Sequence, residues 1–223
     1  MSQIPPPVTE AEFVAVDITD QDEIKRRFGT FVRSLHSYLN QLSCLNDVPK
    51  ARRRWRARVV NTDAFGNLAT DSRHWYTFHH GGRNEAQFNV GLYRTHLRVG
   101  LGFEFSLRRG GDPTAVHLAY ACFTHLIRGD RNGFERFVTD NDLEVEWADN
   151  DGSSIQFVPP TSAVAWLLNP PREPAWIFVG RLLRRGKDSA VLQDSNQLAA
   201  LIQTVFSGFR PIWEQTQVTA HTM

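Results

Sequence analysis

The sequence predicts an α+β fold in which helices flank an antiparallel sheet and the N-terminal segment is helical. Two observations predict this class. Apolar residues alternate with other residues from Leu97 to Leu107, the period of two that places one side of a strand in the core. Apolar residues also recur every three or four positions from Ile24 to Leu42 and from Leu198 to Phe209, which is the spacing of one helical face.

The domain organisation follows from the first fifty residues and from the lack of any linker later. Residues 1–18 contain a run of three prolines and no periodicity, so we expect a flexible arm there. Asp20 and Glu23 form a capping box at the start of the first helix, which Pro49 ends. We therefore expect one α+β domain over residues 19–223, with residues 19–48 packed on it or forming a small subdomain.

The remaining elements are predicted in chain order. Phe88 to Leu92 alternates like the strand that follows it, so the two form a hairpin. Asp112 and Pro113 are a cap and a first helical position. We then expect a short helix over residues 133–138, strands over 143–147 and 153–158, a proline-rich loop over 168–174, a strand over 175–183 and a closing helix that ends before Pro211.

Charge and composition exclude several classes of protein. A net charge of +1 argues against a protein that coats polyanions indiscriminately. No run approaches the roughly 18 apolar residues of a membrane span, and the first residues lack the features of a signal peptide, so we expect a cytoplasmic protein. Cys44 and Cys122 lie among apolar neighbours, where a free buried thiol is the usual outcome.

The polar face of the predicted hairpin carries the first candidate site. A short loop from Tyr93 to His96 would fix the strand register. Glycines on that face remove packing, so either a ligand or another segment of the chain approaches the sheet closely. The register gives these cross-strand pairs: Gly91 with Arg98, Asn89 with Gly100, Gln87 with Gly102, and Glu85 with Glu104.

Glu85 and Glu104 are candidate catalytic and metal-binding residues, because two carboxylates facing each other on a sheet repel and a cation between them would relieve the repulsion. A Mg²⁺ ion there would serve a nuclease, although a nearby arginine would relieve the repulsion equally well. His79 and His80 are candidate general bases beside them. The alternative is that these histidines belong to a turn at the following glycines and bond to the backbone.

An arginine run, Arg52 to Arg58, is the second candidate site. Clustered arginines around a tryptophan suit contact with phosphates and stacking on a base, whereas a solvated helix face or a G- and C-rich genome explains them without function. Arg83 and Asn84 are of the types that read guanine and adenine edges. The full set of predicted nucleic-acid contacts is Arg52, Arg53, Arg54, Trp55, Arg56, Arg58, Arg83, Asn84, Gln87, Asn89 and Arg98.

The sequence lacks the motifs of several common enzyme classes. The sequence has no phosphate-binding glycine loop, dinucleotide fingerprint, nucleophile elbow or zinc spacing. It also lacks the common phosphodiesterase pattern of an acidic residue followed two places later by lysine, since Gln87 follows Glu85 and Ser106 follows Glu104.

One segment resembles known proteins. The run "WYTFHHGGRNEAQFNVGLYRTHLRVGLGFEF", Trp75 to Phe105, resembles DNA-reading or DNA-cleaving proteins of prokaryotic restriction and anti-phage systems. The resemblance implies a DNA-binding protein of such a system, acting on double-stranded DNA, with a second copy or a restriction subunit as protein partner. Two alternatives stay open: a metal-dependent nuclease or nucleotide-processing enzyme, and a module that binds a small molecule or peptide.

Overall fold

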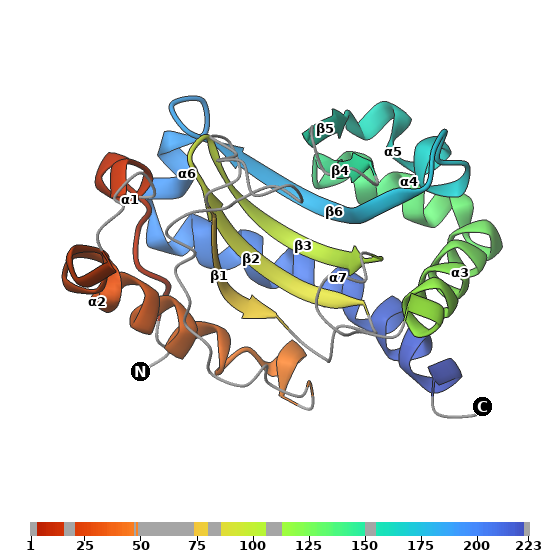
Figure 1. Cartoon of the computed structure of the whole chain (residues 1–223), viewed down its shortest axis with the longest axis horizontal. Coiled ribbons are helices and arrows are strands. Elements are labelled where there is room, and N and C mark those ends of the chain that lie inside the picture. The colour runs from red at the N-terminus through yellow and green to blue at the C-terminus, as the bar shows by residue number, and fades with distance from the viewer. Residues whose placement is uncertain are drawn as a thin grey trace. The chain divides into compact units, whose positions relative to one another are not determined.

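A computed structural model describes residues 4–15, 21–46, 48, 74–79, 86–105, 113–149 and 155–220 (Figure 1). These residues combine helices with an antiparallel sheet, so the predicted α+β class is confirmed. The helices are α1 Glu10–Ala15, α2 Gln21–Leu39, α3 Pro113–Gly129, α4 Arg131–Asp140, α5 Pro160–Leu168, α6 Ser189–Gln193 and α7 Ser195–Ala220, with a 3₁₀ turn at Ser43–Leu45. The strands are β1 His74–His79, β2 Gln87–Tyr93, β3 His96–Glu104, β4 Leu143–Asp149, β5 Ile155–Val158 and β6 Pro174–Arg184.

The strand order is β1-β2-β3-β6-β4-β5. β1 pairs with β2, and β4 pairs with both β5 and β6, in antiparallel register. β3 also runs antiparallel to β6, because the Phe105 amide donates to the Ala175 carbonyl at one end and the Arg185 amide donates to the Thr95 carbonyl at the other, each at 2.8 Å. The strands predicted from alternation are confirmed in type, and the hairpin of β2 and β3 turns at Arg94 and Thr95.

Two compact units make up the chain, and each takes segments from distant parts of the sequence. Unit 1 comprises Met1–His79, Asn89–Val99 and Leu182–Thr204, and unit 2 comprises His80–Phe88, Gly100–Arg181 and Val205–Met223. The boundary predicted at residue 19 therefore falls inside unit 1. Of the five boundaries between the segments of the two units, one follows the end of β1 and four lie inside β2, β3, β6 and α7, where the sequence shows no linker.

In unit 1 residues 4–15, which lie in the segment predicted as a flexible arm, pack onto the protein. Val8 and Phe13 are buried at 1% and 2% exposure, and the Val8 amide donates to the Leu192 carbonyl at 2.7 Å. Glu12 accepts from the backbone amide and hydroxyl of Thr9, which is a capping box that starts α1. α1 contacts α2, and α2 contacts β1.

In unit 2 an aromatic core joins the sheet to α7. The Phe88 ring lies 5.1 Å from the ring of Phe206 and 5.7 Å from that of Trp213. The indole Nε1 of Trp213 donates to the buried Ala86 carbonyl at 3.0 Å. Aromatic pairs at such distances add to the stabilisation from apolar burial, so the alternating apolar residues of the hairpin form the core as predicted.

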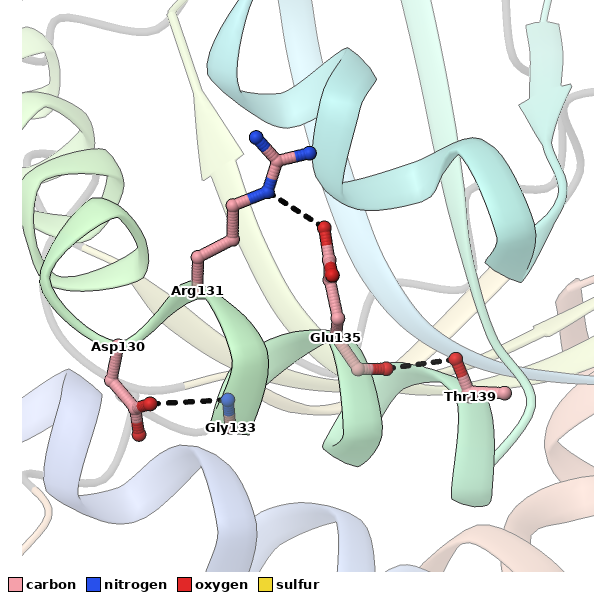
Figure 2. Close-up of polar contacts among 5 residues, drawn as sticks. All are labelled: Asp130, Arg131, Gly133, Glu135 and Thr139. Atoms are coloured by element: carbon pink, nitrogen blue, oxygen red, sulfur yellow. Dashed lines mark hydrogen bonds and ion pairs between the residues drawn. The ribbon is translucent and has the colours of Figure 1, made fainter.

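The helices beside β4 also belong to unit 2. α3 begins at Pro113 as predicted, and Figure 2 shows how α4 begins. The Asp130 carboxylate accepts from the Gly133 amide at 3.1 Å, which satisfies one of the unpaired amides of the first turn. α5 was not predicted, because its apolar residues form a run without the spacing of one helical face.

The closing helix is longer than predicted. α7 continues through Pro211 to Ala220, although an interior proline removes a helical hydrogen bond and crowds the preceding turn. Beyond the proline, Trp213 and Thr216 are buried, and the Trp213 bond to Ala86 holds the second half of the helix. Tertiary packing therefore outweighs the local cost of the proline. In the described parts of the chain, no helix combines the length and apolar character needed to cross a membrane.

Candidate functional site

A buried polar pair lies on the predicted hairpin within unit 1. The Arg98 Nε donates to the Asn89 Oδ1 at 2.9 Å, and the guanidinium carbon lies 4.8 Å from the centre of the Tyr93 ring. Arg98 is 4% exposed and Asn89 is 3% exposed. These two predicted nucleic-acid contacts are therefore interior residues in this structure, and their bond ties the two strands together.

Gly91 makes room for this pair. A Cβ atom at Gly91 would lie 3.3 Å from the Arg98 Nε and 3.3 Å from the Asn89 Oδ1, so a side chain there would crowd the hydrogen bond. The strand register adds His79, the predicted general base, as the backbone partner of Asn89. The sequence left open whether a ligand or another segment of the chain approaches Gly91, and side chains of its own hairpin lie there.

The other two glycines on this face lie against β6 within unit 2. A Cβ at Gly100 would meet the Val179 carbonyl and lie 2.6 Å from the Gly180 Cα and 2.9 Å from the Phe178 ring. Gly102 is less confined, because its nearest neighbours would be 3.6 Å away or more. Of the two alternatives drawn from the sequence, close approach by another segment of the chain therefore accounts for Gly100.

Few of the other predicted site residues lie within the described residues. Glu104 ends β3 and Gln87 begins β2, and both are half-buried. Among the residues that the structure describes, no three histidine, cysteine or acidic side chains gather as they would around a metal ion. Ten predicted site residues lie outside the described residues: Arg52, Arg53, Arg54, Trp55, Arg56, Arg58, His80, Arg83, Asn84 and Glu85.

A group of cationic side chains at one end of unit 1 was not predicted from the sequence. Arg94 lies in the turn between β2 and β3, Arg184 ends β6, and Arg185 and Lys187 follow in the loop before α6. Figure 1 shows these two turns side by side, where the Arg185 amide bonds the Thr95 carbonyl. We call these four residues the cation cluster.

The local backbone holds the cation cluster in a defined shape. The Asp188 carboxylate accepts from the Arg184 amide at 2.7 Å, which closes the loop. Gly186 has a φ of 81°, a left-handed conformation that favours glycine. Lys187 is exposed, while Arg94, Arg184 and Arg185 are half-exposed. The loop therefore presents its cationic side chains to solvent from fixed backbone positions.

Two carboxylates contact the cation cluster. Glu10 pairs with Arg185 through two hydrogen bonds, and Asp188 is bonded to the backbone of Arg184. The cluster gathers four of the 25 lysine and arginine residues of a chain whose net charge is +1. Arrangements of this kind attract polyanions locally while the protein as a whole stays near neutrality.

The sequence shows three of the four residues of the cation cluster as one basic stretch. The stretch Arg181 to Lys187 reads "RLLRRGK", which is as basic as many nucleic-acid-binding segments. Its position beside the turn that carries Arg94 depends on the pairing of β3 with β6, and no local sequence pattern indicates that pairing.

No protein-family model matches the chain, and no curated protein matches it either.

Proposed function

We propose that the chain is a DNA-binding protein of a prokaryotic restriction or anti-phage system, and that the cation cluster contacts the phosphate backbone of a duplex. The observation that supports this proposal is the bond from the Arg185 amide to the Thr95 carbonyl, which brings the turn that carries Arg94 beside the loop that carries the exposed Lys187. Phosphate contacts supply most of the affinity of DNA-binding proteins, and arginine and lysine make most of them.

The arginine run, Arg52 to Arg58, supports the same proposal from the sequence. A second group of arginines within one chain would extend the contact along a duplex and raise the number of phosphates neutralised. The assignment to a restriction or anti-phage system rests on the segment from Trp75 to Phe105, which resembles proteins of such systems. Arg98 and Asn89 have a structural role in this proposal, since both are buried.

The test is the salt dependence of binding to a labelled DNA duplex, measured by fluorescence anisotropy. The logarithm of the association constant falls with the logarithm of salt concentration by about 0.9 for each phosphate contacted. The double variant Arg94→Ala and Lys187→Ala should bind more weakly, and its slope should be shallower by about 1.8 if each residue contacts one phosphate.

The matched control removes the same charge elsewhere. Arg128 and Arg172 are exposed residues of unit 2, so the variant Arg128→Ala and Arg172→Ala should keep the wild-type slope. An equal loss of slope in both variants would show an effect of net charge and contradict the role of the cation cluster. Wild-type protein that fails to bind any duplex would contradict the function itself.

The same preparation separates binding from cleavage. Unmodified and cytosine-methylated duplexes incubated with the protein and Mg²⁺ should be retarded on a gel and remain intact. Fragments that form only with Mg²⁺ would replace this proposal with the nuclease alternative.

A further inference from the structure

The N-terminal segment carries an acidic residue onto the cation cluster. Glu10 is the first residue of α1, and both of its carboxylate oxygens bond the guanidinium of Arg185: Oε2 accepts from Nε at 3.0 Å, and Oε1 accepts from Nη2. All three surrounding elements, α1, the end of β6 and α6, belong to unit 1. The contact is therefore internal to one compact body.

Buried apolar contacts hold Glu10 in this place. Phe13 is 2% exposed, and the Arg185 guanidinium carbon lies 5.8 Å from the centre of its ring. Val8 precedes Glu10 in the sequence, and its amide donates to the Leu192 carbonyl. Val8 and Phe13 therefore fix the backbone on both sides of Glu10. The carboxylate lies beside Arg185 without any further ordering of the backbone.

The ion pair itself is exposed and easily exchanged. The Glu10 side chain is 64% exposed and the Arg185 side chain is 33% exposed. Exposed ion pairs contribute little to folding, because water and salt screen them. The two guanidinium donors that Glu10 occupies form the planar fork that also binds two oxygens of one phosphate group.

We propose that Glu10 competes with a DNA phosphate for the guanidinium of Arg185, so that the N-terminal segment lowers the affinity of the cation cluster for DNA. This inference rests on the proposed function. The exchange needs only rotation of the Glu10 and Arg185 side chains, while Val8 and Phe13 stay buried. The N-terminal segment then acts as a built-in acidic competitor, and anything that removes its charge strengthens DNA binding.

The direct test is the variant Glu10→Gln, which keeps the length of the side chain and removes its charge. We expect it to bind a labelled duplex about threefold to fivefold more tightly than the wild type at low salt. Its salt slope should be steeper by up to about 0.9, because one more phosphate is contacted.

The matched control is Glu135→Gln. Glu135 accepts from the Arg131 Nε at 2.7 Å on the exposed surface of α4 (Figure 2), so this variant also removes one carboxylate from an arginine pair. It changes the net charge by the same amount in unit 2. A gain in affinity as large as that of Glu10→Gln would show a general charge effect and overturn the inference.

Two further variants test the route of the effect. Glu10→Asp keeps the charge but shortens the side chain, so it should lose the two-point pairing and also bind DNA more tightly than the wild type. Arg185→Ala should abolish the gain from Glu10→Gln when the two are combined. A gain that persists without Arg185 would overturn the inference.

Failure of the inference differs from failure of the proposed function. Wild-type protein without measurable affinity for any duplex would remove the proposed function and this inference with it. Wild-type protein that binds DNA, together with Glu10→Gln protein that binds no more tightly, would leave the proposed function in place and overturn the inference alone. Thermal unfolding of each variant confirms that the N-terminal segment remains folded.

Discussion

Replacing Gly100 by alanine tests whether close packing against β6 requires a glycine at this position of β3. The added Cβ would lie 2.6 Å from the Gly180 Cα and 2.9 Å from the Phe178 ring, and it would meet the Val179 carbonyl. Two of these neighbours are backbone atoms, which cannot rotate away as a side chain can. β3 and β6, which lie side by side in the sheet, must therefore move apart at this position.

The cost follows from the packing of the site. Insertion of a carbon atom into a well-packed core costs about 1–3 kcal/mol, and more when the backbone must shift. We therefore expect Gly100→Ala to lower the free energy of unfolding by about 3 kcal/mol. With a urea dependence of about 3 kcal/mol/M, the midpoint of urea unfolding should fall by about 1 M.

Gly102→Ala is the matched control, because Gly102 lies on the same face of the same strand. Its added Cβ would be 3.6 Å or more from every neighbour, which is ordinary contact. Alanine also loses less backbone entropy than glycine on folding, so this variant should be neutral or stabilised by up to about 1 kcal/mol. Tryptophan fluorescence during urea titration gives both midpoints. Equal midpoints for Gly100→Ala and the wild type would refute the packing argument.

Three other substitutions test the polar contacts. Asn89→Ala leaves the buried Arg98 Nε without this acceptor, so urea unfolding should show a loss of about 3 kcal/mol, and an unchanged midpoint would contradict the role of the pair. Trp213→Phe removes the bond to the buried Ala86 carbonyl, so urea unfolding should show a loss of about 1–2 kcal/mol. An unchanged midpoint would contradict the role of this bond in holding α7. Burial raises the pKa of the Tyr38 phenol from 10.0 to about 12, so its stabilising contribution is complete below pH 10 and declines as the pH rises towards 12. Tyrosinate absorbance that Tyr38→Phe removes should appear near pH 12, and its appearance near pH 10 would contradict the burial.

The elements that the sequence predicted well have strong internal periodicity. Alternation from Leu97 to Phe105 identifies β3 because one face of that strand is buried along its length. The start of α3 was predictable because Pro113 suits only the first turn of a helix. Local chemistry of this kind is independent of the remainder of the chain.

The sequence-based expectations and the structure differ where tertiary contacts decide. Val8 and Phe13 are two isolated apolar residues, and only their burial shows that residues 4–15 are packed. Pro211 ends a helix by its local chemistry, yet Trp213 and its bond to Ala86 extend α7 beyond it. Such contacts join residues far apart in the sequence, so no window of the chain reports them.

Prediction of the candidate site from the sequence depended even more on tertiary contacts. Polar residues of the hairpin were predicted as ligand contacts, but burial places Asn89 and Arg98 inside the protein. The sequence shows their type and spacing, and these are the same for a binding pair and for a structural pair. The cation cluster was missed because Arg94 and Lys187 are brought together only by the pairing of β3 with β6.

The interleaving of the two units constrains how this protein is made. Unit 1 needs the segment Leu182–Thr204, and unit 2 needs the segment Val205–Met223. A ribosome must therefore release nearly the whole polypeptide before either unit has all its parts, and early folding of an N-terminal half is excluded as a route to a finished unit. Shortened genes cannot deliver one unit by itself, so we expect the functional module to be inherited and exchanged as an undivided whole.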